Sequence, residues 1–199
     1  MKKCDLLITG VGGQGNILAS DIIGEVALAA GYDVKKTDTL GMAQRGGSVI
    51  SHLRIGQKVF SPLIREGDVD ILLAFEKLEG VRYASYLRPG ATAIINDHAQ
   101  PPLSVNLGVD VYPTDAEVAA ILRQRTDRVH LVDGTRLVAQ LGNARTLNIF
   151  MLGCLSRCLT FTVDQWKQQI AEHLPERLHK INYEAFDLGR EAMKHVATE

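Results

Sequence analysis

Two glycine-rich stretches hold the residues of this chain whose types and spacing suggest binding chemistry. The first, residues 9–16, reads Thr-Gly-Val-Gly-Gly-Gln-Gly-Asn and places Gly10, Gly12 and Gly15 at the Gly-x-Gly-x-x-Gly spacing. Glycines at this spacing let a strand turn sharply into a helix and let the backbone approach a phosphate. A helix that begins there offers unpaired N–H groups and the positive end of its dipole to an anion. The alternative is a tight turn that binds nothing.

The second stretch, residues 41–49, reads Gly-Met-Ala-Gln-Arg-Gly-Gly-Ser-Val. A guanidinium next to glycine N–H groups suits a phosphate or a carboxylate, so Arg45 is the central residue of this stretch. The alternative is a turn that carries a surface arginine. Together the two stretches give the expected binding residues: Gly10, Gly12, Gly13, Gln14, Gly15, Asn16, Arg45, Gly46, Gly47 and Ser48.

Hydrophobic periodicity and turn residues predict the elements that must position these stretches. A strand over 4–9, a helix over 16–30 and a strand over 32–37 form a strand–helix–strand unit around the first stretch. A β-hairpin of 48–55 with 58–60 follows the second stretch. Further strands are expected over 70–75, 92–96, 109–112 and 129–133, and further helices over 77–87, 114–125, 134–142, 143–158, 162–173 and 176–196.

These elements predict an α/β fold, a three-layer α/β/α Rossmann-like domain whose sheet is mixed but mostly parallel. Neither a linker nor a repeat interrupts the chain, so residues 1–199 are expected to form one domain, with a C-terminal helical region from about residue 143. The helix predicted over 143–158 is apolar almost all round, which indicates burial in the core or against another chain.

Composition narrows the classes of protein to which the chain can belong. The 199 residues are 46% hydrophobic and carry a formal net charge of −1, so nothing suggests general attraction to nucleic acid. Three cysteines without a Cys-x-x-Cys pair argue against a disulfide framework and against an iron–sulfur or zinc site in this chain. The first apolar run is too short for a signal sequence, and no run can span a membrane, so we expect a cytoplasmic protein.

The chain lacks a recognisable catalytic set. It has no Gly-x-Ser-x-Gly elbow, no phosphate-binding loop of the Walker type and no His-Glu-x-x-His, and we expect neither a catalytic residue nor a metal ligand. His52 is expected to be structural, and Glu76 either contacts a ligand or caps a helix. A free-standing NAD(P)-binding oxidoreductase would need Asp38 to hold the ribose. The missing catalytic set favours a domain that contributes to chemistry housed in another chain. A non-enzymatic binding module is the remaining hypothesis.

The two stretches, at their mutual spacing, resemble the gamma chain or gamma domain of 2-oxoacid:ferredoxin oxidoreductases. Within that family, residues 41–49 look most like the corresponding part of the beta subunits of indolepyruvate ferredoxin oxidoreductases. Pyruvate and 2-oxoglutarate relatives more often carry a Gly-Pro-Glu-type lead into Arg-Gly-Gly. The resemblance extends to residues 148–153 and 182–189, and so covers nearly the whole chain.

The resemblance implies an accessory subunit of an enzyme that oxidatively decarboxylates indolepyruvate, or another aryl pyruvate, to an acyl-CoA. A larger alpha subunit would hold thiamine diphosphate and 4Fe-4S clusters and pass electrons to ferredoxin. This chain would hold no cofactor tightly, and it would be inactive alone. Coenzyme A would be a co-substrate at a shared site, beside residues 12–15 and 45–48.

Overall fold

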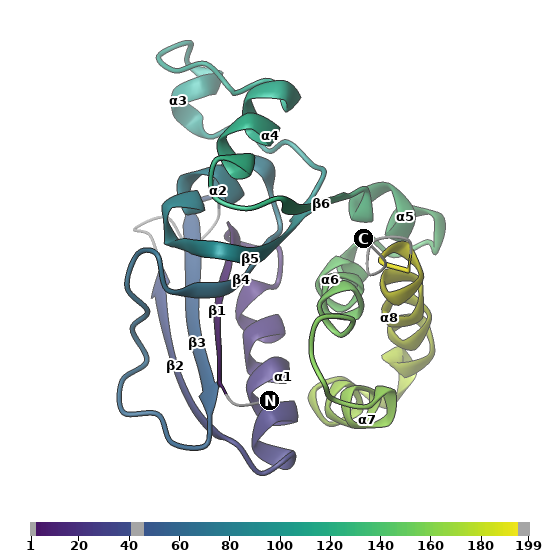
Figure 1. Cartoon of the computed structure of the whole chain (residues 1–199). Coiled ribbons are helices and arrows are strands. Elements are labelled where there is room, and N and C mark those ends of the chain that lie inside the picture. The colour runs from purple at the N-terminus through teal and green to yellow at the C-terminus, as the bar shows by residue number, and fades with distance from the viewer. Residues whose placement is uncertain (1–2, 41–45, 195–199) are drawn as a thin grey trace.

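The computed structural model describes residues 3–40 and 46–194 and shows a six-stranded mixed sheet with helices packed on both faces (Figure 1). The strands lie in the order β2-β3-β1-β4-β5-β6, and β3 is antiparallel to both of its neighbours while the other pairs are parallel. The expected fold class is confirmed. The strand bounds are β1 (Lys3–Val11), β2 (Asp33–Leu40), β3 (Ser48–Gly56), β4 (Val69–Ala74), β5 (Leu87–Asn96) and β6 (Arg128–Val132).

Side-chain caps start several of the helices. Capping boxes at Thr114 with Glu117, and at Thr162 with Gln165, start α4 and α7, which lie within the helices predicted over 114–125 and 162–173. The helices are α1 (Asn16–Ala29), α2 (Lys77–Arg82), α3 (Leu103–Asn106), α4 (Asp115–Arg123), α5 (Gly134–Gln140), α6 (Leu147–Leu155), α7 (Val163–His173) and α8 (His179–Ala192). Short 3₁₀ turns are η1 (Ala84–Tyr86), η2 (Ala144–Thr146) and η3 (Glu176–Leu178).

The predicted hairpin of 48–55 with 58–60 is wrong. Residues 58–60 form no strand, and Phe60 is 84% exposed. β3 instead lies between β2 and β1 and pairs with both along its length. Because β3 is largely buried on both faces, two long partners satisfy its backbone groups better than one three-residue return strand could.

The strand predicted over 109–112 is also wrong. Those residues lie in a projection between α3 and α4, and β6 takes the place beside β5. Other elements are shorter than expected or divided: residues 77–87 hold α2, η1 and the first residue of β5, residues 143–158 hold η2 and α6, and residues 176–194 hold η3 and α8. β5 starts early because Leu87 already pairs with Val69 of β4.

Alternation along the strands divides the core between the two faces of the sheet. Leu6 and Ile8 of β1 belong to the larger cluster, which also includes apolar residues of α1, α6, α7 and α8. Leu7 belongs to a second cluster on the opposite face, with residues of β4, β5, η1 and α4. The loop after β1 therefore leads to a helix on one face, and the loop after β4 leads to α2 on the other.

Helix α6 is core rather than an outer surface, because all of its residues are buried. It crosses α8 closely at Gly153 and Gly189: a Cβ at either position would lie 2.1 or 2.0 Å from a backbone oxygen of the facing helix. Despite its apolar sequence α6 has only 9 residues. No helix in the described ranges is long and apolar enough to cross a membrane.

We predict that Gly153→Ala destabilises the fold by about 3 kcal/mol or more, because the new methyl group overlaps the Phe186 carbonyl of α8. Denaturant unfolding of the purified chain measures this change. Gly24→Ala is the matched control, since a Cβ there meets no atom closer than 3.7 Å. The control should be neutral or stabilising by up to about 1 kcal/mol, as alanine favours a helix over glycine. Equal losses in the two variants would contradict the packing argument.

Candidate functional site

The two glycine-rich stretches meet at the edge of the sheet where β1 and β4 end and β3 begins. The chain leaves β1 towards α1 on one face and leaves β4 towards α2 on the opposite face. Such a change of side between neighbouring parallel strands opens a crevice, and ligands of open α/β sheets bind there. The edge is therefore the candidate functional site.

Backbone hydrogen bonds join the two stretches directly. The Gly12 N–H donates to the Gly47 carbonyl at 2.8 Å, and the Gly46 N–H donates to the Gly12 carbonyl at 3.4 Å. These bonds continue the β1–β3 ladder beyond its last pair, Val11 with Ser48. The structure thus brings together the described residues of both stretches, while Arg45 lies outside the described residues.

Gly10 makes room for side chains of its own turn rather than for a ligand. A Cβ at Gly10 would lie 2.6 Å from Asn16 Nδ2 and 2.7 Å from Gln14 Oε1. Gln14 folds back, so that its Oε1 accepts from the Val11 N–H at 2.8 Å and its Nε2 donates to Gln100 Oε1 at 3.2 Å. Glycine is therefore needed at position 10 to make room for the Asn16 and Gln14 side chains, rather than for the sharp turn or the phosphate approach that the sequence suggests.

Gly13 and Gly15 have different surroundings within the turn. Both have positive φ, which favours glycine. A Cβ at Gly15 would meet the Asn148 side chain of α6 at 2.8 Å, whereas one at Gly13 would meet nothing within 4 Å. Helix α1 starts here, and its first N–H groups, which have no partner within the helix, donate to no N-cap side chain either. The turn therefore keeps an open, anion-favouring side at Gly13.

Asn16 is an unusual residue at the start of α1. Its side chain is buried, at 3% exposure, and neither of its amide atoms has a hydrogen-bond partner among the described residues. The Thr9 hydroxyl is in the same condition. A buried polar group without a partner costs about 1–3 kcal/mol, so such groups concentrate where function requires them. Two of them lie within the first glycine-rich stretch.

A cleft of about 340 Å³ opens at this edge of the sheet. It is lined by residues of both glycine-rich stretches, of α2 and of the chain after β5: Val11, Gly46, Ser48, Glu76, Leu78, Glu79, Arg82, Gln100, Pro101, Pro102 and Asn106. Of the residues that the sequence predicts for the site, Gly46 and Ser48 therefore line the cleft.

Glu76 both lines the cleft and caps a helix, so the two roles considered for it coexist. Its Oε2 accepts from the Glu79 N–H at 2.8 Å at the start of α2. Its Oε1 accepts from the Gln100 N–H at 3.0 Å and from the Tyr112 hydroxyl. Gln100 and Tyr112 were not predicted from the sequence, because they reach Glu76 only through the fold.

Glu79 is a second buried carboxylate in the cleft, also not predicted. Ser48 Oγ donates to its Oε2 at 2.5 Å, and Arg82 lies 3.2 Å from its other oxygen. Burial raises the pKa of Glu79, an effect that Ser48 and Arg82 oppose and Glu76 reinforces. The described charges of the cleft are therefore two carboxylates and one guanidinium.

Asp38 cannot serve as the ribose ligand that a dinucleotide site requires. β3 separates β2 from β1, which puts Asp38 two strand spacings, about 9.5 Å, away from β1. Its carboxylate accepts from Ser51 Oγ and lies 3.1 Å from Lys36 Nζ. A free-standing NAD(P)-binding oxidoreductase would therefore lack the ribose contact that it requires from Asp38.

The remaining titratable candidates have structural partners. His52 is buried, accepts from the Ile64 N–H at 3.3 Å, and has a pKa lowered by burial, in line with the structural role expected for it. Asp97 pairs with Lys77 at 2.9 Å. Within residues 3–40 and 46–194, no group of three His, Cys, Asp or Glu side chains could hold a metal ion.

We predict that Glu79→Gln raises the melting temperature relative to the parent chain, and that the gain grows as pH rises above the ordinary Glu value of 4.5. The unfolded carboxyl ionises first, so the parent loses stability from about that pH up to the raised folded pKa. Thermal unfolding from pH 4 to pH 8 measures the difference.

Glu117→Gln is the control of opposite sign. The Thr114 N–H and hydroxyl lower the pKa of Glu117, so this variant should lose stability relative to the parent as pH rises. A pH-independent difference for Glu79→Gln would contradict the assignment of a buried, disfavoured charge.

Comparison with known proteins places the chain in a family. It is 36% identical to the indolepyruvate oxidoreductase subunit IorB of Pyrococcus horikoshii over 199 residues, which is 98% of each chain. The IorB subunit of Archaeoglobus fulgidus is 35% identical over 94% of each chain.

Solved structures share the fold. The gamma subunit of a keto/oxoacid ferredoxin oxidoreductase from Geobacter sulfurreducens superposes with a TM-score of 0.69 at 22% identity, over 95% of this chain and 97% of that one. A 2-oxoglutarate:ferredoxin oxidoreductase from Magnetococcus marinus, with 2-oxoglutarate, coenzyme A and succinyl-CoA bound, gives 0.74 at 20% identity, over 98% of this chain and 32% of that one. Residues 5–192 match the pyruvate ferredoxin/flavodoxin oxidoreductase family, and the chain belongs to that family.

Proposed function

We propose that the chain is the accessory subunit of an indolepyruvate:ferredoxin oxidoreductase, which oxidatively decarboxylates an aryl pyruvate to an acyl-CoA. One observation carries the choice of substrate. Relatives named as indolepyruvate oxidoreductase subunits are 33–36% identical, whereas those named for pyruvate/ketoisovalerate or 2-oxoglutarate are 24–26% identical. A free-standing NAD(P) enzyme and a non-enzymatic module are not favoured, since these relatives are named as oxidoreductase subunits.

The proposal divides the chemistry between two chains. A larger alpha subunit holds thiamine diphosphate and the 4Fe-4S clusters, and ferredoxin receives the electrons. Thiamine diphosphate supplies carbanion stabilisation for the decarboxylation when it is bound.

Coenzyme A is the proposed co-substrate at the shared site, against the Gly12–Gly15 turn and the chain from Gly46 to Ser48. Three features support its fit: the open backbone at Gly13, the uncapped N-terminus of α1 and the buried, unpartnered Asn16 amide. Arg45 belongs to the proposed site on its sequence position alone. Coenzyme A would be held only in the complex, and this chain binds no cofactor tightly.

The charges of the cleft suggest how coenzyme A would lie. Glu76 and Glu79 are buried carboxylates, which repel phosphate groups at close range in a region of low dielectric. The phosphates would therefore lie at the Gly13 side of the turn. The uncharged, amide-containing part of coenzyme A that ends in the thiol suits the cleft itself, where Gln100 and Pro101 form part of the wall.

The chain as a whole, residues 1–199, is proposed to be a single gamma-type domain, with a helical region from about residue 143. The support is that α6 and α8 share one apolar cluster with β1, β4 and β5. We also propose that the chain is located in the cytoplasm.

Reconstitution tests the division of labour. The chain alone should not reduce ferredoxin with indolepyruvate and coenzyme A, whereas the chain with the larger subunit should. Within that complex, Gln14→Glu should raise the KM for coenzyme A about tenfold, because it adds a negative charge beside the proposed phosphate site. The variant loses the exposed hydrogen bond from Gln14 Nε2 to Gln100 Oε1. The fold should persist, because a carboxylate at a helix N-terminus is favourable and still accepts from the Val11 N–H.

Gln57→Glu is the matched control, since it makes the same charge change at the far end of β3. This control should leave the KM for coenzyme A and the KM for the 2-oxoacid unchanged. A Gln14→Glu effect on the KM for the 2-oxoacid alone would contradict the coenzyme A assignment. Turnover by the isolated chain would contradict the accessory role.

A further inference from the structure

A projecting segment beside the cleft has no role in the function described so far. It consists of residues 101–113, which we call the arm, and it runs from the cleft wall through α3 to the start of α4 (Figure 1, top). Its sequence from Leu107 to Tyr112 alternates apolar residues, which predicts a strand, yet these residues pair with no strand of the described chain. Leu107, Val109 and Val111 therefore favour burial by residue type but lie at the surface.

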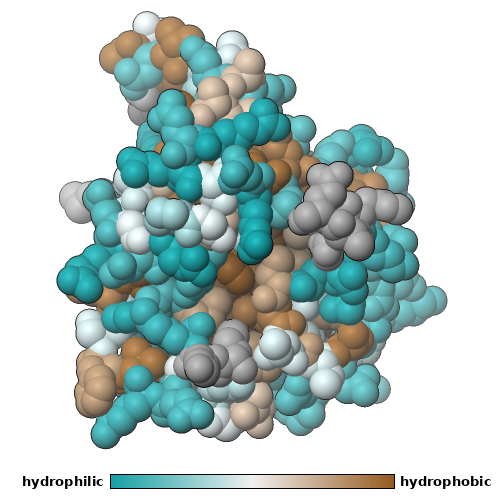
Figure 2. Space-filling model, viewed as in Figure 1, coloured by the Kyte–Doolittle hydropathy of each residue, from teal (hydrophilic) through white to brown (hydrophobic). Residues whose placement is uncertain are grey.

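Three apolar side chains near the tip of the arm face solvent. Leu107 is 68% exposed, Val109 75% and Val111 92%. Figure 2 shows hydrophobic residues gathered at this end of the molecule. A hollow of about 310 Å³ lies at the base of the arm, lined by Val111, Tyr112, Pro113, Glu117, Ala120 and Ile121. Contiguous exposed apolar groups of this kind mark interaction surfaces.

The segment of the chain that carries this apolar surface is acidic. Residues 97–117 contain Asp97, Asp110, Asp115 and Glu117 but no lysine or arginine. Asp97 and Asp115 share Lys77, whereas Asp110 is exposed and Glu117 caps α4. A surface complementary to the arm is therefore apolar at its centre and basic at its rim.

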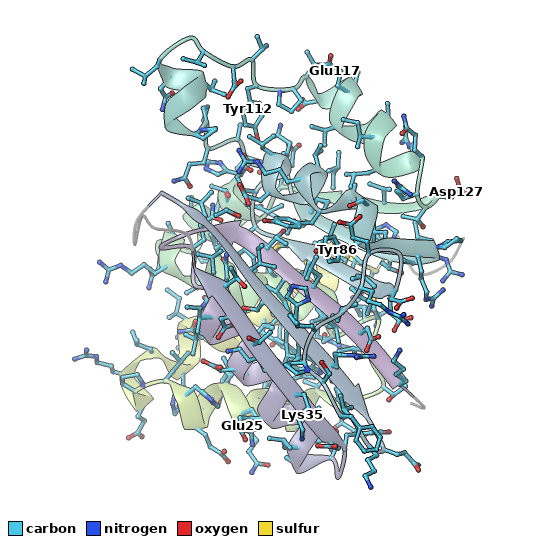
Figure 3. The ribbon with its side chains drawn as sticks, turned by 90° about the vertical axis from the view of Figure 1, so that its left-hand side faces the viewer. Glu25, Lys35, Tyr86, Tyr112, Glu117 and Asp127 are labelled. Atoms are coloured by element: carbon cyan, nitrogen blue, oxygen red, sulfur yellow. The ribbon has the colours of Figure 1, made fainter. Side chains whose placement is uncertain are left out.

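The base of the arm is fixed to the cleft. The Tyr112 hydroxyl donates to Glu76 and accepts from the Leu78 N–H at 3.3 Å. Figure 3 shows Tyr112 and Glu117 at this end of the molecule, beside α3 and α4. Burial, followed by Glu76, raises the pKa of Tyr112, so the phenol keeps the proton that it donates. Pro101, Pro102 and Asn106 of the arm are themselves part of the cleft wall.

We propose that the arm docks on the larger subunit of the complex, in an apolar surface with a basic rim. The inference rests on the proposed function, because that function requires a second chain to complete the cleft. A chain that closes the cleft lies against the wall formed by Pro101, Pro102 and Asn106, and so reaches the apolar tip. Docking buries Val109 and Val111, while Tyr112 already anchors the base of the arm to Glu76.

Combined Val109→Asp and Val111→Asp substitutions test the arm. The two proteins are co-purified, and their dissociation constant is measured by sedimentation. The double variant should bind the larger subunit at least tenfold more weakly, because the docked state would bury two unpaired charges. A milder Val111→Ser variant should weaken binding less. Since both side chains are exposed, circular dichroism and melting temperature should match the parent chain.

Phe60→Asp is the matched control. Phe60 is 84% exposed, but it lies on the loop between β3 and β4, at the end of β3 opposite Ser48. It should leave the dissociation constant unchanged. Parent-like binding by the double variant would overturn the arm proposal and leave the proposed function standing.

Two other outcomes also overturn the proposal. If the parent chain alone forms a dimer that the double variant abolishes, while the complex is unaffected, the arm binds a second copy instead. If the parent chain forms no complex with the larger subunit at all, the proposed function fails and the arm proposal fails with it.

Discussion

The pairing of β3 with β1 is the interaction on which the rest of the structure depends. The two strands pair from Lys3 with Gly56 to Val11 with Ser48, and hydrogen bonds of Gly12 with Gly46 and Gly47 extend the ladder into the turn. The N–H and C=O groups that face each other across this seam pair with each other, while the remaining groups of β1 and β3 pair with β4 and β2. A shift of register by one residue would turn apolar side chains to the opposite face. The seam therefore fixes the position of the second glycine-rich stretch relative to the first.

The same seam decides which ligands the edge can accept. By separating β2 from β1 it removes Asp38 from the position that a dinucleotide ribose requires. It leaves a cleft between the β1 turn and α2, with buried carboxylates at Glu76 and Glu79. What remains open to an anion is the Gly13 side of the turn and the start of α1. The site is thus one wall with few charges of its own, which suits a subunit whose partner supplies the reactive groups.

Local signals explain what the sequence could predict. The apolar run of β1, the glycine turn and the two threonine capping boxes each act within a few residues, and the structure has all of them. Strand order depends on pairing between distant segments, so the place of β3 was not predictable from local pattern. Gly15 is constrained by Asn148, and Glu76 meets Gln100 and Tyr112, only after the chain has folded. Residues 109–112 have strand-like composition but no partner among the described strands, and Val109 and Val111 are exposed.

We propose that the glycine turn forms one wall of a coenzyme A site that another chain completes. Hydrogen–deuterium exchange of the assembled complex, with and without coenzyme A, tests it most directly. Coenzyme A should slow exchange at the backbone amides of residues 12–18 and 46–48, and it should do so only when the larger subunit is present. Unchanged exchange at these amides, in a complex that turns over, would contradict the claim.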